Sequence, residues 1–475
     1  MSISADVLRS YRSIDEKTVD ELLAQEIKNN NKKIVVLDDD PTGVQTVHDI
    51  SVYTGWDADS LREAFAEENN LFYILTNSRG FTEEQTKEAH LEIADAVDRA
   101  AKEASRDYIF ISRSDSTLRG HYPLETRLLK ECYERNTGVK LDGEILCPFF
   151  KEGGRYTIGN VHYVKYGDEL VPAHETEFAK DKTFGYTAEN LPDYVEEKTA
   201  GEYKAKDVIS ISLEDIRSMD FDKIKSQLMS AKNFNKIIVN AIDYSDIKVF
   251  AVALFRAMNA GKMFMFRTAA ALVKVMGGVS DMPLLTRSDM IVNETENGGI
   301  IVVGSHTAKT TSQLECLKEI ADIEFIELDA NLVRDEEGFA NEVDRCLALE
   351  GEYIESGKTV CCYTSRSLVV ANTGDKEDEL RLSVRISDAV QSLVGRLPVT
   401  PSFVVAKGGI TSSDVGVKAL KVKRATVLGQ IKPGIPVWQT GSESKFPNTP
   451  YVIFPGNVGE ATTLREAAEE LMNKR

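Results

Sequence analysis

The sequence predicts an α/β protein with two domains, each a mostly parallel sheet flanked by helices. Short runs of β-branched and aromatic residues alternate with amphipathic helical segments along most of the 475 residues, and this alternation is typical of βαβ units. The alternation forms two series, separated at about 276–298 by a stretch rich in Gly, Pro, Asn and polar residues. We therefore expect domains at about 1–285 and 286–475, with the active site in the cleft between them.

The first series alternates apolar strand patterns with helical patterns, of which 82–104 and 124–134 are the clearest. Residues 150–206 break this rhythm because Gly, Tyr, Thr and acidic residues dominate there. We expect an irregular insertion at 150–206 that covers the functional edge of the sheet. The expected strands of the first series are 33–37, 71–76, 108–112, 145–149, 208–211, 236–240 and 263–267.

The second series begins near residue 299 and predicts a second sheet of the same kind. Its apolar runs are short and are separated by further helical segments, as in βαβ units. The expected strands of this series are 300–303, 325–328, 359–363, 403–407, 425–428 and 451–454.

Composition argues against several classes of protein. The 57 Lys and Arg against 76 Asp and Glu give a net charge of −19, whereas binders of nucleic acid or anionic membranes need a positive field. No apolar stretch reaches the roughly 18 residues of a membrane span, and the N-terminus lacks the apolar core of a signal peptide. We expect a cytoplasmic protein whose six cysteines are reduced.

Three carboxylates follow the first expected strand, at Asp38, Asp39 and Asp40, and Pro41 and Gly43 then force a tight turn. Ligands bind at the carboxyl ends of strands in open α/β sheets. Adjacent carboxylates repel one another, so such a cluster suits a place where hydroxyls, amides or a metal use it. The alternative is a solvated turn in which an Asp caps the next helix, and the sequence does not show which Asp points inward.

Two further polar loops follow strands, at 76–80 with Arg79 and at 111–121. The combination of Arg, Asp and Ser in these loops suits a polyhydroxylated anion, because Arg binds a carboxylate through two N–H groups while Asp and Ser bind hydroxyls. One such loop alone could simply cap a helix, but three at consecutive strand ends indicate a shared site. The loop at 111–121 contributes Arg113, Ser114, Asp115, Ser116, Thr117 and Arg119.

The second domain contains glycine-rich turns between a strand and a helix, at 300–308, 403–420 and 451–461. Free amides at a helix N-terminus bind phosphate, and glycine allows the phosphate to approach the backbone closely. Any one of these could be an ordinary turn, but three in one domain favour a nucleotide site.

Two other motifs do not support a function. Ser356-Gly-Lys-Thr359 resembles the end of a Walker A loop, but it leads into a strand instead of a helix. No GxGxxG fingerprint is present, which argues against a nicotinamide-dependent dehydrogenase, and the six histidines show no HxxxH pair that would indicate a metal site.

Four motifs, in this order, resemble those of the four-carbon acid sugar kinases, formerly a domain-of-unknown-function group. The resemblance extends over nearly the whole chain. It implies an N-terminal acid-sugar-binding domain and a C-terminal nucleotide-binding domain, and it implies phosphorylation by ATP of threonate, erythronate or 3-oxo-tetronate at O4. The motifs are Asp39-Asp-Pro-Thr-Gly43, Asp115-Ser-Thr-Leu-Arg-Gly120, Gly304-Ser305 and Lys407-Gly-Gly-Ile-Thr411.

The resemblance implies that Asp39 orients the attacking hydroxyl and could accept its proton, while Arg79 and Arg113 hold the sugar carboxylate. The chain departs from the usual family pattern at Arg113, where Lys is frequent, and at Ile410, where an acidic residue is common. It departs again at 454–455, where Phe-Pro replaces a common Lys-Ser. The residues expected to contact the acid sugar are Asp39, Asp40, Arg79, Arg113, Ser114, Asp115 and Ser116, and those expected to contact ATP are Ser305, Gly408, Gly409, Ile410, Thr411 and Gly456.

The sequence thus predicts a carbohydrate kinase that binds an acid sugar and ATP with Mg²⁺, and binds neither nucleic acid nor membrane; a homodimer is left open. Two other readings remain. A non-catalytic sensor of acid sugar or nucleotide would keep the same loops without turnover, and a nicotinamide-linked oxidoreductase would need the missing fingerprint. The sequence identifies neither the stereochemistry of the substrate nor the metal ligands.

Overall fold

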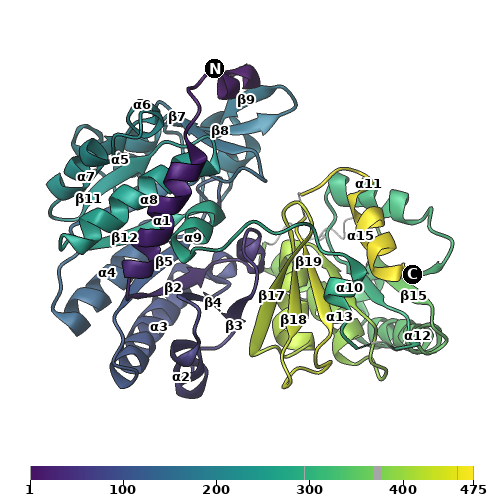
Figure 1. The fold of residues 1–475 in the computed structure, drawn as a ribbon. Helices are drawn as coiled ribbons and strands as arrows, with labels where there is room; N and C mark the ends of the chain where they lie inside the picture. The colour runs from purple at the N-terminus through teal and green to yellow at the C-terminus, as the bar shows by residue number, and fades with distance from the viewer. Residues whose placement is uncertain (1, 294, 367–375, 457, 474–475) are drawn as a thin grey trace. The chain divides into compact units, whose positions relative to one another are not determined.

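The structure, a computed structural model, describes residues 2–293, 295–366, 376–456 and 458–473, which form two units (Figure 1). Unit 1 comprises Met1–Gly43 and Gly55–Asp281, and unit 2 comprises Val44–Thr54 and Met282–Arg475. In each unit helices pack on a sheet that is wholly or largely parallel. The predicted two-domain α/β fold is therefore confirmed.

The sheet of unit 1 has the strand order β10-β11-β6-β12-β5-β2-β4, and its neighbouring strands are parallel. Its central strands are buried along their whole length, which explains their continuous apolar runs because helices cover both faces of such sheets. The strands are β2 (Lys33–Asp38), β4 (Leu71–Leu75), β5 (Tyr108–Arg113), β6 (Gly143–Cys147), β10 (Ile209–Ile211), β11 (Asn235–Val239) and β12 (Phe264–Thr268).

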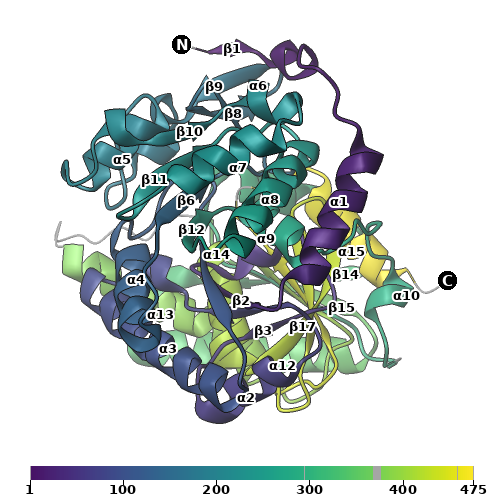
Figure 2. The ribbon, with the colours of Figure 1, turned by 60° about the vertical axis from the view of Figure 1, so that its left-hand side comes forward.

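The main helices of unit 1 pack in two groups. Helix α3 contacts α2 and α4, while α8 contacts α1, α7 and α9, and the α8 group lies across the strands in Figure 2. Helix α3 begins with a capping box between Thr82 and Gln85, which satisfies free N–H groups of its first turn. The helices are α1 (Glu16–Asn29), α2 (Ala58–Ala66), α3 (Glu83–Glu103), α4 (Leu124–Thr137), α6 (Leu213–Arg217), α7 (Phe221–Ser230), α8 (Tyr244–Asn259) and α9 (Ala270–Gly277).

The sequence predicted an irregular insertion at 150–206, and this prediction is wrong. The segment contributes to a small antiparallel sheet of order β1-β9-β8-β7 and contains a helix, α5 (Leu191–Lys198). It was missed because its strands are short and are joined by tight turns with left-handed glycines at Gly159 and Gly167, which resemble loop sequence. Its strands are β1 (Ile3–Ser4) from the N-terminus, β7 (Arg155–Ile158), β8 (Val161–Tyr166) and β9 (Glu169–Pro172).

The sheet of unit 2 has the order β3-β17-β18-β19-β16-β13-β15-β14. The five strands from β19 to β14 are parallel, whereas β3, β17, β18 and β19 pair antiparallel. In this antiparallel part β17 and β19 correspond to the predicted strands at 425–428 and 451–454, whereas β3 and β18 have no counterpart in the predicted series. The strands are β3 (Ile50–Tyr53), β13 (Ile300–Val303), β14 (Ile323–Leu328), β15 (Thr359–Thr364), β16 (Val404–Lys407), β17 (Arg424–Lys432), β18 (Ile435–Thr440) and β19 (Pro450–Phe454).

A segment from the first part of the chain, Val44–Thr54, belongs to unit 2 although it lies within the first domain of the sequence prediction. Its strand β3 pairs with β17, and the Gln45 side chain donates a hydrogen bond of 3.1 Å to the carbonyl of Gly434. The partners are more than 370 residues apart in the chain, so no local pattern could predict this pairing.

The helices of unit 2 enclose a core cluster that includes Leu314, Ile301 and Leu464. No helix in the described ranges of the chain is long and apolar enough to cross a membrane. The helices are α10 (Arg287–Met290), α11 (Ala308–Leu317), α12 (Glu336–Glu355), α13 (Lys376–Gly395), α14 (Gly409–Asp414) and α15 (Thr463–Met472).

Candidate functional site

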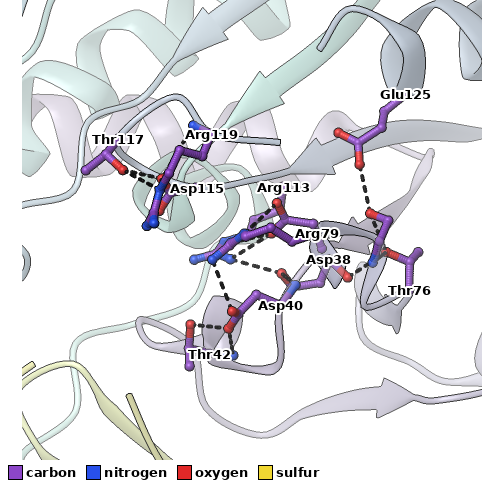
Figure 3. A network of polar contacts seen from close by, with 12 residues as sticks. Asp38, Asp40, Thr42, Thr76, Arg79, Arg113, Asp115, Thr117, Arg119 and Glu125 are labelled. Atoms are coloured by element: carbon purple, nitrogen blue, oxygen red, sulfur yellow. Dashed lines mark hydrogen bonds and ion pairs between the residues drawn. The ribbon is translucent and has the colours of Figure 1, made fainter. Parts of the chain in front are cut away.

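The three polar loops predicted from the sequence follow three adjacent strands of unit 1, in the order β5-β2-β4. The strands are parallel and in register, so that Asp38 at the end of β2 pairs with Leu75 on β4 and with Arg113 on β5. The carboxyl ends of the three strands therefore lie side by side, and their loops meet in one polar network (Figure 3).

Arg79 and Arg113 bind the aspartates of the first loop. The Arg79 Nη2 and Nε atoms lie 2.6 Å and 3.2 Å from the two carboxylate oxygens of Asp39, and its Nη1 lies 3.0 Å from Asp40. The Arg113 Nη1 lies 3.1 Å from Asp38 Oδ1 and 3.6 Å from Asp39 Oδ1. The arginines expected to hold the sugar carboxylate thus pair with the carboxylates of the protein itself in this structure.

Burial and ion pairing compete at these carboxylates. Burial raises the pKa of Asp38 to about 7, although Arg113 opposes it, and burial also raises the pKa of Asp39 against the opposing effect of Arg79. At Asp40 burial acts in the same direction, but Arg79 and the hydrogen bonds from Thr42 outweigh it and lower the pKa. The three adjacent carboxylates are therefore unequal, and Asp40 is the one most firmly held as an anion.

Gly43 is needed in the tight Pro-Thr-Gly turn that follows the aspartates. A Cβ atom at Gly43 would lie 2.0 Å from Asp38 Oδ2, far inside van der Waals contact. Only glycine therefore lets the loop fold back against the buried Asp38 carboxyl group.

The loop after β5 forms a second ion pair beside the first. Arg119 Nε lies 2.8 Å from Asp115 Oδ2, and the Thr117 hydroxyl donates to the same carboxylate oxygen. Burial would raise the pKa of Asp115, but Arg79 and Arg119 hold it well below its usual range. Ser114 and Ser116 of this loop are buried, so the predicted acid-sugar residues do gather at one edge of the sheet.

Two charged residues of this network were not singled out from the sequence, namely Glu125 in the first turn of α4 and Arg267 near the end of β12. Arg267 Nη1 lies 3.3 Å from Glu125 Oε2, and its Nη2 donates to the carbonyl of Arg119 at 3.2 Å. The Ser78 hydroxyl donates to Glu125 Oε1 at 2.8 Å. Arg267 carried a usable signal, a cation at the end of an apolar strand, whereas Glu125 resembled any first-turn glutamate.

Unit 2 contains a pocket of about 320 Å³ at the carboxyl ends of β13 and β16. Glycines, hydroxyls, aliphatic side chains and the imidazole of His306 line it, without a lysine, arginine or carboxylate among its described residues. Five of the six predicted ATP-binding residues are in this lining. The lining residues are Gly304, Ser305, His306, Ala330, Ser383, Ile386, Ser387, Val390, Gly408, Gly409, Ile410 and Thr411.

Two turns of the pocket pack together where only glycine fits. Gly408 has a φ of +125°, and a Cβ atom there would lie 3.1 Å from the Ser305 side chain. A Cβ atom at Gly304 would lie 2.3 Å from the Thr411 hydroxyl. The two glycines therefore let these turns pack closely against each other, and both turns line the pocket.

The sixth predicted residue, Gly456, lies beside the pocket. Its carbonyl accepts hydrogen bonds of 3.4 Å from the hydroxyls of both Thr307 and Thr310, and a Cβ atom on Gly456 would lie 3.7 Å from Ser305 Oγ. The third glycine-rich turn therefore meets the first, while Asn457 of that turn lies outside the described residues.

Lys407, the last residue of β16, places a buried cation under two of these turns. Its ammonium group donates a hydrogen bond of 2.5 Å to the carbonyl of Pro455 and lies 4.4 Å from the centre of the Phe454 ring. Burial lowers the pKa of Lys407 to about 7. The resemblance includes this lysine in its motif, but no local sequence pattern indicates that it is buried and holds the neighbouring turn.

No group of three or more His, Cys, Asp or Glu with a metal-binding arrangement occurs in the part of the chain that the structure describes. The Asp38–Asp40 oxygens are instead in contact with arginine N–H groups and Thr42. The expected Mg²⁺ and the expected position of the active site between the domains stay predictions.

Both parts of the chain match known families. Residues 34–276 match the family described as "Sugar-binding N-terminal domain", and residues 300–464 match the family described as "Nucleotide-binding C-terminal domain". The first match contains the ion-pair network and the second contains the glycine-lined pocket. A search of curated proteins found no significant match.

Solved structures show the same fold. A Haemophilus influenzae protein given as DUF1537 has a TM-score of 0.59 at 18% identity, covering 92% of this chain and 100% of that one. A Salmonella typhimurium LT2 protein has a TM-score of 0.65 at 13% identity, covering 92% and 98%. The tRNA synthase activity suggested by the name of the Salmonella protein concerns that protein, because likeness at such low identity shows the fold alone.

Proposed function

Since the chain belongs to the family that joins a sugar-binding N-terminal domain to a nucleotide-binding C-terminal domain, the architecture of four-carbon acid sugar kinases, we propose that it is an ATP-dependent kinase acting on a tetronate. The substrate would be threonate, erythronate or 3-oxo-tetronate, and the terminal O4 hydroxyl would receive the γ-phosphoryl group. The coarser role, a carbohydrate kinase type, follows from the two domains, and the choice of substrate is the proposal.

The observation that carries the choice of an acid sugar is the ion-pair network at the ends of β2, β4 and β5. Arg79 uses three of its five N–H groups on Asp39 and Asp40, which leaves two for a ligand. A guanidinium fixed in this way is pre-organised for a carboxylate, so binding loses little side-chain entropy. The neighbouring carboxylates and buried hydroxyls can accept and donate hydrogen bonds to the hydroxyls of a sugar.

The pocket of unit 2 suits ATP for different reasons. Ile386, Val390 and Ala330 offer apolar contact to a base, and the backbone of the Gly408–Thr411 turn can approach phosphates closely. Lys407 places an amino group beneath the turns, and with a pKa of about 7 it carries a positive charge in roughly half of the molecules at pH 7. These features favour a nucleotide, and the γ-phosphoryl group would leave from the end that faces the glycine turns.

Phosphoryl transfer depends mainly on alignment and charge neutralisation. We assign Asp39 to orient the O4 hydroxyl and to accept its proton, a role that its raised pKa favours because a base is most effective when its pKa approaches the working pH. Mg²⁺ would accompany the phosphates of ATP, as is usual for kinases, and no protein ligand for it is assigned.

The test is ADP release by the purified protein with Mg-ATP across D- and L-threonate, D- and L-erythronate and 3-oxo-tetronate, with mass spectrometry of the product. The uncharged polyols erythritol and threitol serve as controls matched in carbon number. We expect turnover with one or a few of the acids and none with the polyols. ATP binding without a phosphorylated product from any acid would instead favour the non-catalytic sensor.

A further inference from the structure

The insertion at 150–206 is hydrogen-bonded to the loop that carries Asp115. Three of its side chains donate hydrogen bonds to three consecutive backbone carbonyls of that loop. His162 Nε2 lies 2.7 Å from the carbonyl of Ser116, Tyr186 Oη lies 3.2 Å from that of Thr117, and Tyr194 Oη lies 2.9 Å from that of Leu118. All three donors are at most 6% exposed, so water does not compete with them freely.

The donor role of His162 is fixed by its two partners. A carbonyl oxygen can only accept, so Nε2 carries the proton, and Nδ1 then accepts from the Thr157 hydroxyl at 3.0 Å. Burial lowers the pKa of His162 to about 4, so the ring is neutral at pH 7. His162 therefore acts as a fixed donor between strand β8 and the loop.

The loop that carries Asp115 has an unusual backbone conformation. Leu118 has a φ of +74°, in the left-handed region that leucine rarely adopts. Strained backbone of this kind persists where the surroundings hold it in place. The carbonyls of Thr117 and Leu118, on either side of the Leu118 amide and side chain, are the ones that Tyr186 and Tyr194 bind.

The insertion also positions the cation that pairs with Asp115. The guanidinium carbon of Arg119 lies 5.0 Å from the centre of the Phe178 ring, which belongs to the insertion. Such contact between a cation and an aromatic ring is favourable. Arg119 in turn donates to Asp115, so the insertion contacts both the backbone of the loop and its charged pair.

We infer that the insertion is a positioning element of the candidate sugar site, and that His162, Tyr186 and Tyr194 hold Asp115 and Arg119 where a sugar hydroxyl can meet them. Tyr122, at the end of the same loop, stacks on Tyr194 at 5.8 Å between ring centres, which extends the contact. The inference about the loop stands on geometry alone, whereas its effect on tetronate binding rests on the proposed function.

Amide hydrogen exchange tests directly whether the hydrogen bonds from the insertion hold this loop in place. The amide of Leu118 donates to the Asp115 carbonyl at 3.0 Å and that of Arg119 to the Asp115 carboxylate at 3.4 Å, so their exchange reports opening of the loop. In the double variant Tyr186→Phe with Tyr194→Phe we expect both amides to exchange roughly 5- to 50-fold faster, because two net hydrogen bonds are lost.

The matched control is Tyr166→Phe, which removes a tyrosine hydroxyl from the same insertion. That hydroxyl contacts the exposed Glu177 at 3.0 Å and does not reach the loop. We expect no change at Leu118 and Arg119 in this variant. Unchanged exchange in the double variant, or equal acceleration in the control, would overturn the inference.

Kinetics test the consequence for the site. In the double variant we expect KM for L-threonate or D-erythronate to rise about 5- to 50-fold while KM for ATP stays unchanged, since a general loss of folded protein would lower kcat without this split. His162→Gln, whose amide can replace Nε2–H, should keep the wild-type KM that His162→Leu loses. Faster exchange without a change in either tetronate KM would also overturn the positioning role. If the wild-type protein phosphorylates neither of these two acids, KM is measured with whichever of the other tetronates it phosphorylates. If it phosphorylates none of them, the proposed function fails, and the exchange result alone decides whether the insertion holds the loop.

Discussion

In unit 1 the loops at the strand ends are filled with charged side chains that pair with one another, whereas the pocket of unit 2 is lined by glycines, hydroxyls and aliphatic groups. Arg113 and Asp38 are 5% and 2% exposed, so their charges are held away from water. The chain has a net charge of −19, and long-range attraction cannot bring an anion to it. If, as proposed, each unit binds an anion, it has to do so at short range, unit 1 with fixed cations and unit 2 with backbone amides.

The candidate sites of the two units differ in the kind of substitution that disrupts them. Removing one partner of a buried ion pair leaves the other charge uncompensated, which typically costs about 3–5 kcal/mol. In a glycine-lined pocket the sensitive feature is space, because a single added methyl group strains the backbone or meets a neighbouring atom. The following variants are ordered from the largest expected effect to the smallest.

Asp39→Asn should have the largest effect. It keeps the size of the side chain but removes the charge that pairs with Arg79, so we expect turnover to fall about 10²–10⁴-fold if Asp39 is the general base. The measurement is kcat for ADP release, with a thermal melt to confirm folding. Asp40→Asn is the matched control, since Asp40 also pairs with Arg79 but is not expected to act as the base. Near-normal turnover in Asp39→Asn would leave Asp39 a purely structural role.

Arg79→Lys should raise the KM of the tetronate roughly 10- to 150-fold, the equivalent of about 1.5–3 kcal/mol for a charge-assisted contact. Lysine cannot present two parallel N–H groups to a carboxylate. ATP affinity should change little, and the preference for the acid over the uncharged polyol should weaken. Arg62→Lys, at an exposed position of unit 1, controls for the exchange itself. Wild-type behaviour of Arg79→Lys would mean that another cation holds the carboxylate, and Arg119 would be tested next.

Gly408→Ala should weaken ATP binding about tenfold, a change of roughly 1.4 kcal/mol, and leave tetronate binding unaffected. The added methyl group would approach the Ser305 side chain at a backbone φ of +125°, a conformation that strains any residue but glycine. Calorimetry with each ligand separately provides the measurement. Gly434→Ala, with φ of +76° outside the pocket lining, imposes similar strain elsewhere in unit 2. Equal loss of ATP affinity in both variants would mean that general destabilisation, and not the pocket, is responsible.

The last prediction concerns stability instead of ligand binding, and so stands outside the order of the other three: Glu350 in α12 is fully buried, and burial raises its pKa to about 8. The folded state therefore keeps this proton up to about pH 8, whereas an unfolded glutamate releases it near pH 4.3. Stability should fall as pH rises between these values, by at most about 1.4 kcal/mol per pH unit. Urea unfolding at pH 5, 6.5 and 8 should show a flatter dependence in Glu350→Gln than in wild type.

The exposed Glu337 on the same helix supplies the control variant Glu337→Gln, which should keep the wild-type slope. An equal slope in Glu350→Gln and wild type would show that Glu350 is already ionised and paired in the folded protein. In that case the contrast between paired charges in unit 1 and a buried carboxyl group that stays protonated in unit 2 would not hold.

Local patterns predicted much of the fold. The strand at 300–303 is present with the same bounds, and β2, β4 and β5 differ from their predictions by one residue at the end. These strands are continuous apolar runs, and such runs are what a sheet covered on both faces requires. The insertion at 150–206 was misread because its strands alternate, are short and depend on one another for their pairing.

The residues of the candidate sites also fall into two groups: some could be predicted from local sequence patterns, and others depend on contacts between distant parts of the chain. Asp39, Arg79 and Asp115 could be selected because polar clusters directly after apolar strands stand out in a sequence, and parallel strands bring their ends together. The pairing of these residues could not be predicted, because the direction of the side chains and the register between strands decide which arginine contacts which aspartate. Glu125 and Arg267, which complete the network, lie 142 positions apart in the chain.

By itself, then, the sequence determined the α/β class, the two series of strands, the charged loops and the glycine turns, because each of these is written in residues close together along the chain. Only the tertiary structure decided that β3 pairs with β17 in unit 2, that Lys407 is buried under the Pro455 turn, and that the insertion grips the Asp115 loop. These contacts join residues from 46 to more than 370 positions apart. They form only when packing of the whole unit brings their partners together, and no local propensity encodes them.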